Sequence, residues 1–243
     1  MTTVFGQVAD TYDDVRPGYP TGIADAIGAY AGKIDAAVEV GSGTGLGTAV
    51  LTRLGVPMTC IEPDPRMAAL LAVKYPHAAV SVGTFEQWAP PPGGVALLGC
   101  AMAWHWLDQA TRNQHAFDAL RPGGTLAVFG HSYAFADPVH EQAITGAFTS
   151  CGIPRRDKPR LWFHDDILAS GLWADVRHEE FTRDVDFTTE RYLRLHQTFS
   201  PHLRRSPAQQ RMVLDALRDA VDGLGGVIHL RLPTTVALAR RPL

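Results

Sequence analysis

The stretch Val38-Glu39-Val40-Gly41-Ser42-Gly43-Thr44-Gly45 decides the fold of this 243-residue chain. It closes an apolar run that starts at residue 36, and it leads into residues 46–54, whose apolar side chains recur at helical spacing. Glycine allows the backbone to turn tightly and to approach a ligand closely, and a helix that follows such a turn offers free N–H donors. The stretch therefore predicts a buried strand, a ligand-binding turn and a helix.

The same pattern of a short apolar run followed by a helical stretch repeats through the first half of the chain. Strands are expected at 36–40, 58–61, 79–82, 95–100 and 125–129. Helices are expected at 46–54, 65–74 and 109–120. Alternating steps of this kind predict a mostly parallel sheet with helices on both faces.

The second half of the chain has a different rhythm. Residues 133–170 and 188–223 are expected to form helical insertions that cover the substrate, with strands at 176–186 and 227–240. These last strands suggest an antiparallel edge. The expected fold class is therefore a single α/β domain over 1–243, with a doubly wound, mostly parallel seven-stranded sheet, an antiparallel edge strand and helical lid segments.

Composition excludes several classes of protein. The net charge of -3 provides no global cationic field, so we expect no binding of nucleic acid or of a membrane surface. The three cysteines show no C-x-x-C spacing, which is typical of a protein of the reducing cytoplasm. Neither an export signal nor a long apolar membrane span is visible, so a cytoplasmic location is expected.

A carboxylate after the second strand adds to the glycine turn. Glu62 stands 21 residues after Gly41, where an acidic side chain can accept hydrogen bonds from both hydroxyls of a ribose. The turn and Glu62 together indicate a ligand that contains adenosine. A dinucleotide fingerprint is a poor match, because Leu46 stands where that pattern has its third glycine.

Over nearly the whole chain the sequence resembles the class I methyltransferases that use S-adenosylmethionine (SAM), which have a Rossmann-like fold. Within them it is most similar to the small-molecule branch that includes trans-aconitate methyltransferases. Besides the glycine turn, the resemblance is carried by Tyr12-x-x-x-Arg16-Pro17-x-Tyr19-Pro20, Glu62-Pro63-Asp64-x-x-Met67, Gly83-Thr84-Phe85-Glu86, Ala103-Trp104-His105-Trp106-x-Asp108 and Leu120-Arg121-Pro122-Gly123-Gly124.

The resemblance implies a set of cofactor-binding residues. The methionine portion of SAM would lie against Glu39, Gly41, Gly43 and Gly45, the ribose against Glu62, and the adenine between Pro63 with Met67 and Thr84 with Phe85, with Ala101 also in the cofactor set. An Asp is common in the family where Thr84 stands. Residues 1–30 would form an N-terminal lid that brings Tyr12, Arg16 and Tyr19 over the sulfonium and excludes water.

The sequence also offers candidates for the residues near the methyl acceptor. His105 and His131 follow the fourth and fifth strands and are the candidate general bases, because imidazole titrates near neutral pH. Trp104, Trp106 and Tyr133 are candidates for the substrate-binding wall, although Trp104-His105-Trp106 fits a packing role equally well. No metal is required. If the acceptor is already ionised, Arg16 or the basic cluster Arg155, Arg156 and Arg160 could orient it.

The predicted function is therefore SAM-dependent methyl transfer to an oxygen, nitrogen or carbon of a small molecule in specialised metabolism, with S-adenosylhomocysteine (SAH) as the product. The enzyme would act as a monomer or homodimer. Three alternatives stay open: a non-catalytic SAM-binding regulator, an NAD(P)-dependent oxidoreductase, and a serine hydrolase suggested by the elbow-like Gly130-His131-Ser132-Tyr133-Ala134.

Overall fold

The computed structural model describes residues 4–153 and 161–243. Its centre is one sheet in the order β3-β2-β1-β4-β5-β8-β6, with β7 paired to β8. The strands are β1 (Ala37–Val40), β2 (Met58–Glu62), β3 (Ala79–Val82), β4 (Val95–Ala101), β5 (Leu120–His131), β6 (Ala134–Phe135), β7 (Ala174–Thr188) and β8 (Val227–Arg240). Strands β1 to β5 pair in parallel, which confirms the predicted doubly wound α/β sheet.

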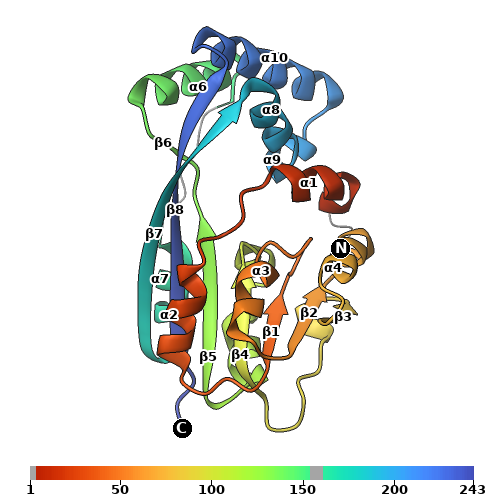
Figure 1. Cartoon of the computed structure of the whole chain (residues 1–243), viewed down its shortest axis with the longest axis vertical. Helices are drawn as coiled ribbons and strands as arrows, with labels where there is room; N and C mark the ends of the chain where they lie inside the picture. The colour runs from red at the N-terminus through yellow and green to blue at the C-terminus, as the bar shows by residue number, and fades with distance from the viewer. Residues whose placement is uncertain (1–3, 154–160) are drawn as a thin grey trace.

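Helices cover both faces of the sheet (Figure 1). The α-helices are α1 (Ala9–Val15), α2 (Gly22–Ala31), α3 (Thr48–Leu51), α4 (Pro65–Lys74), α5 (Arg112–Ala119), α6 (Pro138–Ser150), α7 (Trp162–Ala169), α8 (Thr189–Gln197), α9 (Ser200–Leu203) and α10 (Pro207–Gly223). Short 3-10 turns lie at Phe5–Val8, Thr52–Leu54, Phe85–Gln87 and Trp104–Trp106. Apolar side chains of α2, α3 and α4 fill the core on one face, and those of α5 and α7 fill the core on the other.

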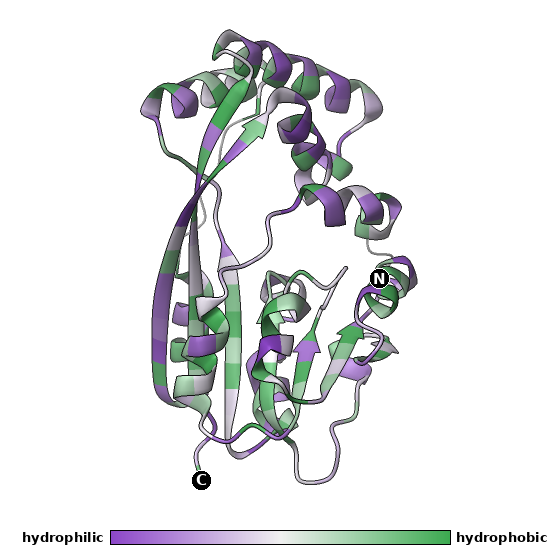
Figure 2. Ribbon diagram, viewed as in Figure 1, coloured by the Kyte–Doolittle hydropathy of each residue, from purple (hydrophilic) through white to green (hydrophobic). Residues whose placement is uncertain are grey.

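The alternation of side chains along β1 shows how the sequence produces these layers. Val38 and Val40 point into the core that α5 and α7 cover, whereas Ala37 points into the core under α2, α3 and α4. Every residue of β1 is buried, as expected for a central parallel strand. Figure 2 shows the same distribution, with apolar colouring along the central strands and mixed colouring on the flanking helices.

The predicted antiparallel strand is present, and it lies one place in from the edge. Strand β8 runs antiparallel to β5 on one side and to β7 on the other. The chain leaves β7 through α8, α9 and α10 and returns as β8, which fills the space between β5 and β7. Strand β7 is therefore the outer strand, and its solvent-facing positions are polar.

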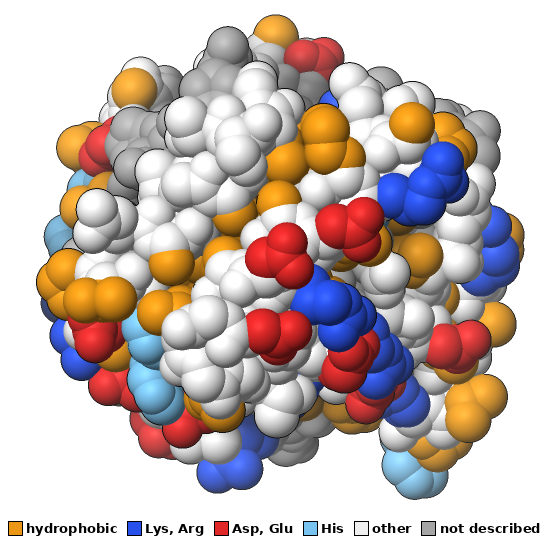
Figure 3. Space-filling model, turned by 90° about the horizontal axis from the view of Figure 1, so that it is seen from above, with side chains coloured by type: hydrophobic (Ala, Val, Ile, Leu, Met, Phe, Trp, Pro, Cys, Tyr) orange, Lys and Arg blue, Asp and Glu red, His pale blue; other side chains and the backbone are white. Residues whose placement is uncertain are grey.

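Strands β7 and β8 extend beyond the body of the sheet and carry a helical cap, formed by α6, α8, α9 and α10 (Figure 1). This cap has its own apolar cluster, to which Phe187, Leu193, Leu217 and Ile228 contribute. Seen from above, over the cap, acidic and basic side chains are interspersed (Figure 3).

The helical segments that were expected to cover the substrate divide between two tasks. Helices α6, α8, α9 and α10 belong to the cap, but α7 packs on the sheet through Phe163 and Ile167. Likewise, of the expected lid over residues 1–30, α2 packs on the sheet through Ile23 and Ile27, and only the segment before it crosses the carboxyl edge. The basic cluster Arg155, Arg156 and Arg160 lies outside the described residues.

Candidate functional site

The glycine turn leaves the carboxyl end of β1 and needs its glycines. Gly41, Gly43 and Gly45 have φ values of 66°, 56° and 93°, in the left-handed region that favours glycine. A Cβ on Gly45 would lie 2.5 Å from the ring of Tyr75, so this position tolerates no side chain. Helix α3 begins at Thr48, two residues later than expected, because the turn continues through Gly47.

Glu62 holds the turn from the neighbouring strand. Its carboxylate accepts a hydrogen bond from the backbone N–H of Gly43 at 2.8 Å and another from the N–H of Asp64 at 2.9 Å. The residue is 4% exposed, and burial raises the pKa of its carboxyl group. Each carboxylate oxygen has a second lone pair, so Glu62 can still accept hydrogen bonds from the hydroxyls of a ribose.

Glu39 is the second buried carboxyl group under the turn. Its Oε2 accepts a hydrogen bond from the Thr48 hydroxyl at 2.5 Å, whereas its Oε1 is buried without a hydrogen-bond partner in the described part of the chain. Burial raises the pKa of Glu39 to about 8. A buried oxygen without a partner favours a ligand that supplies a hydrogen-bond donor. The ammonium group of a bound methionine moiety is such a donor.

Residues predicted to border the adenine lie around the ends of β2 and β3. Met67, 4% exposed on α4, has its Cε atom 3.8 Å from the Cβ position of Gly43, which places it beside the turn. Thr84 is half-buried, and Phe85 is buried in the core beside Trp88 and His115. This packing favours a supporting role for Phe85.

The N-terminal segment reaches from the turn region to the cap. Arg16 donates hydrogen bonds to the hydroxyl and the carbonyl oxygen of Thr198, and its guanidinium lies 4.8 Å from the ring centroid of Tyr12 and 4.3 Å from that of Phe199. Tyr19 packs edge-on against Phe129. The segment therefore bridges the two halves of the molecule over the carboxyl edge of the sheet.

His131 is the last residue of β5. Its Nε2 lies 3.3 Å from the Tyr133 hydroxyl and its ring is 5.2 Å from that of Tyr19. Burial, together with the charges of Arg16 and Arg183, lowers the pKa of His131 to about 3. The imidazole is therefore neutral at pH 7 and a weak base in this environment, unlike the base that the sequence suggested.

The Trp104-His105-Trp106 turn divides between core and surface. Trp104 is 1% exposed, and its indole N–H donates to Asp166 at 2.9 Å, so this side chain packs in the core instead of forming a substrate wall. Trp106 is 41% exposed and packs against Phe5 of the N-terminal segment. His105 lies beside Trp106 at the same edge.

Sequence reasoning missed two residues beside His131. Arg183 of β7 acts on the ionisation of His131 and Tyr133, and Phe199 packs 5.3 Å from Tyr133. Arg183 reaches this region because β7 pairs with β8 and β8 pairs with β5, and Phe199 lies between α8 and α9 of the cap; the sequence indicated neither arrangement. Only the polar alternation within residues 176–186 hinted that one face of this strand is occupied.

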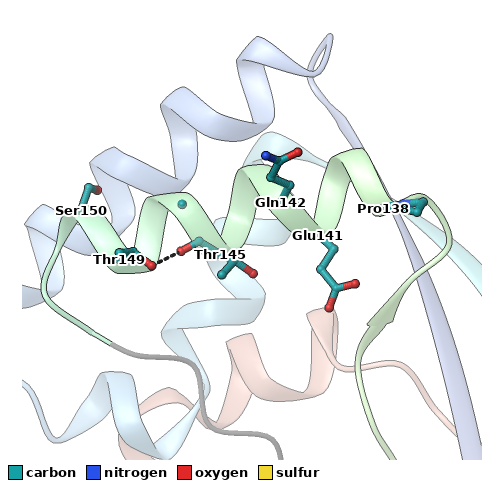
Figure 4. Close-up of a pocket in the computed structure, with 7 residues that line it drawn as sticks. Pro138, Glu141, Gln142, Thr145, Thr149 and Ser150 are labelled. Atoms are coloured by element: carbon teal, nitrogen blue, oxygen red, sulfur yellow. Dashed lines mark hydrogen bonds between the residues drawn. The ribbon is translucent and has the colours of Figure 1, made fainter.

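Two hollows lie outside the glycine turn, one beside Tyr133 and one along α6. A cavity of about 140 Å³, the Tyr133 cavity, is lined by aromatic and aliphatic side chains that include Tyr133, Phe135, Phe148 and Phe199. A larger, open hollow runs along one face of α6, where Glu141, Thr145 and Thr149 line it, and no residue of the glycine turn takes part (Figure 4).

The described residues hold no group of three or more His, Cys, Asp or Glu side chains placed to bind a metal ion. No helix in the described ranges has the length and apolar character to span a membrane.

Comparison with known proteins agrees with this geometry. Residues 38–128 match the family model of the methyltransferase domain. An uncharacterized methyltransferase of Mycobacterium tuberculosis is 31% identical over 129 residues, 53% of this chain and 52% of the relative, so the chain spans about half the length of that relative. Trans-aconitate 2-methyltransferase of Rhizobium meliloti is 28% identical over 232 residues, covering 85% of this chain and 87% of the relative.

Solved structures share the fold. A protein of Anaeromyxobacter dehalogenans described as a type II methyltransferase superposes with a TM-score of 0.68 at 20% identity, over 94% of this chain and 99% of that one. A phosphoethanolamine N-methyltransferase of Haemonchus contortus in complex with SAM gives a TM-score of 0.56 at 12% identity, over 98% of this chain and 57% of that one. Residues 38–128 thus match a methyltransferase domain, and the glycine turn, the two buried carboxyl groups and the sheet order make the fold of the chain similar to that of the class I SAM-dependent methyltransferases.

Proposed function

We propose that the protein is an enzyme that transfers the methyl group of SAM to a small-molecule acceptor and releases SAH. One observation carries the proposal: the glycine turn lies between Glu62, which accepts from the Gly43 N–H at 2.8 Å, and Glu39, whose buried Oε1 has no hydrogen-bond partner among the described residues. With a left-handed glycine turn between them, one buried carboxyl group can accept hydrogen bonds from a ribose and the other from an ammonium group.

The chain's own residues position the reactants. When bound, SAM supplies an electrophilic methyl group on a positively charged sulfur. Glu62 accepts hydrogen bonds from the ribose hydroxyls, and Glu39 accepts a hydrogen bond from the ammonium group of the methionine portion. The acceptor approaches from the side of His131 and Tyr133, while Tyr12 and the rest of the N-terminal segment exclude water.

The state of His131 bears on which acceptor is suited to the site. A neutral imidazole whose conjugate acid has a pKa of about 3 holds a proton poorly at neutral pH. An acceptor that reaches the site already ionised, or with a lone pair free, is therefore favoured over one that needs a strong base. We place the enzyme in the cytoplasm, as a monomer or homodimer acting in specialised metabolism, where Cys60 and Cys100 stay reduced in the core.

Calorimetric titration with SAH tests the cofactor assignment. Gly43→Ala and Gly55→Ala form a matched pair, because both glycines have left-handed φ values and neither Cβ would meet an atom closer than 3.8 Å. Both variants carry a similar backbone strain of about 1–2 kcal/mol, but only Gly43 faces the proposed ligand. We expect Gly43→Ala to weaken SAH binding at least about tenfold and Gly55→Ala to leave it unchanged.

The alternatives give different results in the same experiment. Wild-type protein that binds NADH and not SAH would support the oxidoreductase and overturn the proposal. If the protein binds SAH but transfers no methyl group from SAM to any acceptor in a broad panel of small molecules, the result would favour the non-catalytic regulator. Equal SAH affinity of Gly43→Ala and wild type would mean that the glycine turn does not hold the cofactor.

A further inference from the structure

Two arginines, Arg16 and Arg183, have no acidic partner among the described residues. Arg16 donates from Nε to the Thr198 hydroxyl at 2.8 Å and from Nη2 to the Thr198 carbonyl oxygen at 3.0 Å. Arg183 donates through Nη2 to the carbonyl oxygen of Gly18, and its Nε is buried without a hydrogen-bond partner. Within residues 4–153 and 161–243 neither guanidinium forms an ion pair. Partly buried charges of the same sign are costly without a counter-charge, so this site favours an anion.

Other unpartnered polar atoms lie on the same face of the sheet. In the register of the antiparallel strands, His131 of β5 is paired with Thr234 of β8, and Thr234 is paired with Phe181 of β7. Paired residues point to the same face, and Arg183 follows Phe181 by two positions, so His131, Thr234 and Arg183 share one face. His131 Nδ1 and Thr234 Oγ1 are both buried and without a hydrogen-bond partner.

These two residues are well shielded from solvent in the folded chain. His131 is 8% exposed and Thr234 is 1% exposed. A neutral imidazole and a hydroxyl can each donate one hydrogen bond to an anionic oxygen. Together with the Nε of Arg183 they make a set of donors for which the described chain supplies no acceptor.

The Tyr133 cavity adjoins this set of donors. Tyr133 lines the cavity, and its hydroxyl lies 3.3 Å from His131 Nε2. Phe199 also lines the cavity, and the Arg16 guanidinium lies 4.3 Å from its ring centroid. His196, on the cavity wall, has its pKa lowered to about 3 by burial and neighbouring cations, so the wall carries no charge at pH 7. At about 140 Å³ the cavity is close to the volume of roughly 150 Å³ that accommodates a benzene-sized ring.

We propose that the methyl acceptor is amphipathic: an anionic oxygen group, a carboxylate or a phosphate, binds between Arg16 and Arg183, and an apolar body of about the size of one ring fills the Tyr133 cavity. The inference rests on the proposed function and names the substrate class of that site. Planar guanidinium groups match the paired oxygens of such anions, and the aromatic wall provides the apolar contact. The anionic group is the anchor that orients the acceptor toward the sulfonium.

Calorimetry on the full chain saturated with SAH tests the proposal. The probes are phenylacetate and phenyl phosphate, the neutral isostere phenylacetamide, and acetate, which has the charge without the ring. We expect one of the two aromatic anions to bind at least about tenfold more tightly than phenylacetamide and than acetate. Whichever anion binds better identifies the anionic group.

Arginine variants assign the site. Arg183→Gln should weaken binding of the better probe at least about tenfold while SAH affinity stays at the wild-type value. Arg177→Gln makes the same charge change at an exposed position of the same strand and should have no effect. If Arg183→Gln fails to fold, Arg16→Gln should likewise weaken binding of the better probe at least about tenfold.

The outcomes separate the two proposals. Equal binding of the aromatic anions and phenylacetamide would overturn the anion site, and equal binding of the aromatic anions and acetate would overturn the role of the cavity. Loss of probe binding in Arg177→Gln to the same extent as in Arg183→Gln would also overturn the assignment. In each case the cofactor assignment of the proposed function stands if the wild-type chain binds SAH, and it falls if SAH does not bind.

Discussion

Replacing Glu62 by glutamine removes one of the two oxygens that organise the turn. In the wild-type chain the carboxylate accepts from the N–H groups of Gly43 and Asp64, at 2.8 and 2.9 Å. A glutamine of the same shape offers one oxygen and one NH2 group, so one of the two N–H groups would face a donor. Because Glu62 is 4% exposed, water cannot readily replace the lost acceptor, and the cost is about 1–3 kcal/mol.

Thermal unfolding with and without SAH measures both effects of this change. For a chain of this size each kcal/mol lowers the Tm by about 2–4 °C, so Glu62→Gln should unfold several degrees below wild type. Its SAH affinity should fall about tenfold through the weakened ribose contact, and the stabilisation by saturating SAH should shrink accordingly. Glu179→Gln, an exposed change on β7, serves as the control and should match wild type. An unchanged Tm together with unchanged SAH affinity would refute the reasoning.

Three further predictions concern the core and the turn. SAH binding at pH 7 should release close to one proton, because burial raises the pKa of Glu39 to about 8 and this carboxyl group must ionise beside the ligand's ammonium group. Calorimetry in buffers of different ionisation enthalpy measures the release. Above pH 9 Glu39 is already ionised before SAH binds, so the release should be lost. Gly45→Ala should destabilise the fold by at least about 2 kcal/mol in urea unfolding, through left-handed strain and the clash with Tyr75. Asp166→Asn should cost about 3–5 kcal/mol in the same assay, because it leaves the buried Arg112 charge unpaired.

Matched variants make these predictions specific. Glu39→Gln cannot ionise, so it should bind SAH without releasing a proton. The Cβ of Gly55→Ala would meet no atom within 4 Å, so only left-handed backbone strain should lower its stability, by about 1–2 kcal/mol. Asp165→Asn changes a side chain that is 66% exposed and should alter stability by less than about 0.5 kcal/mol. If Asp166→Asn were no more destabilising than Asp165→Asn, the buried pair would not stabilise the fold.

The first half of the chain was predictable because its signals are local. The apolar runs and the glycine turn fixed strands β1 to β5, and the position of Glu62 at the end of β2 follows from chain order alone. Local periodicity also gave the helices approximately, although residues 46–54 hold a short α-helix from Thr48 followed by a 3-10 turn.

The acceptor side was not predictable in the same way. Arg183 comes to lie near His131 through two successive antiparallel pairings, and neither pairing leaves a local trace in the sequence. Trp104 was misassigned for a related reason: its partner Asp166 is 62 residues away, and nothing near Trp104 distinguishes a core tryptophan from one in a pocket wall. A strongly shifted histidine pKa likewise depends on burial that only the assembled fold creates.

The two sides of the site come from different parts of the gene product. Glu39, Glu62 and the turn between them lie inside residues 38–128, the stretch that the family shares, whereas Arg16, His131 and Arg183 lie outside it. If these residues bind the methyl acceptor as proposed, mutations in the flanking segments should change which compound is methylated and leave the contacts of Glu39 and Glu62 with the cofactor intact. Related proteins could then differ in substrate through sequence changes outside residues 38–128.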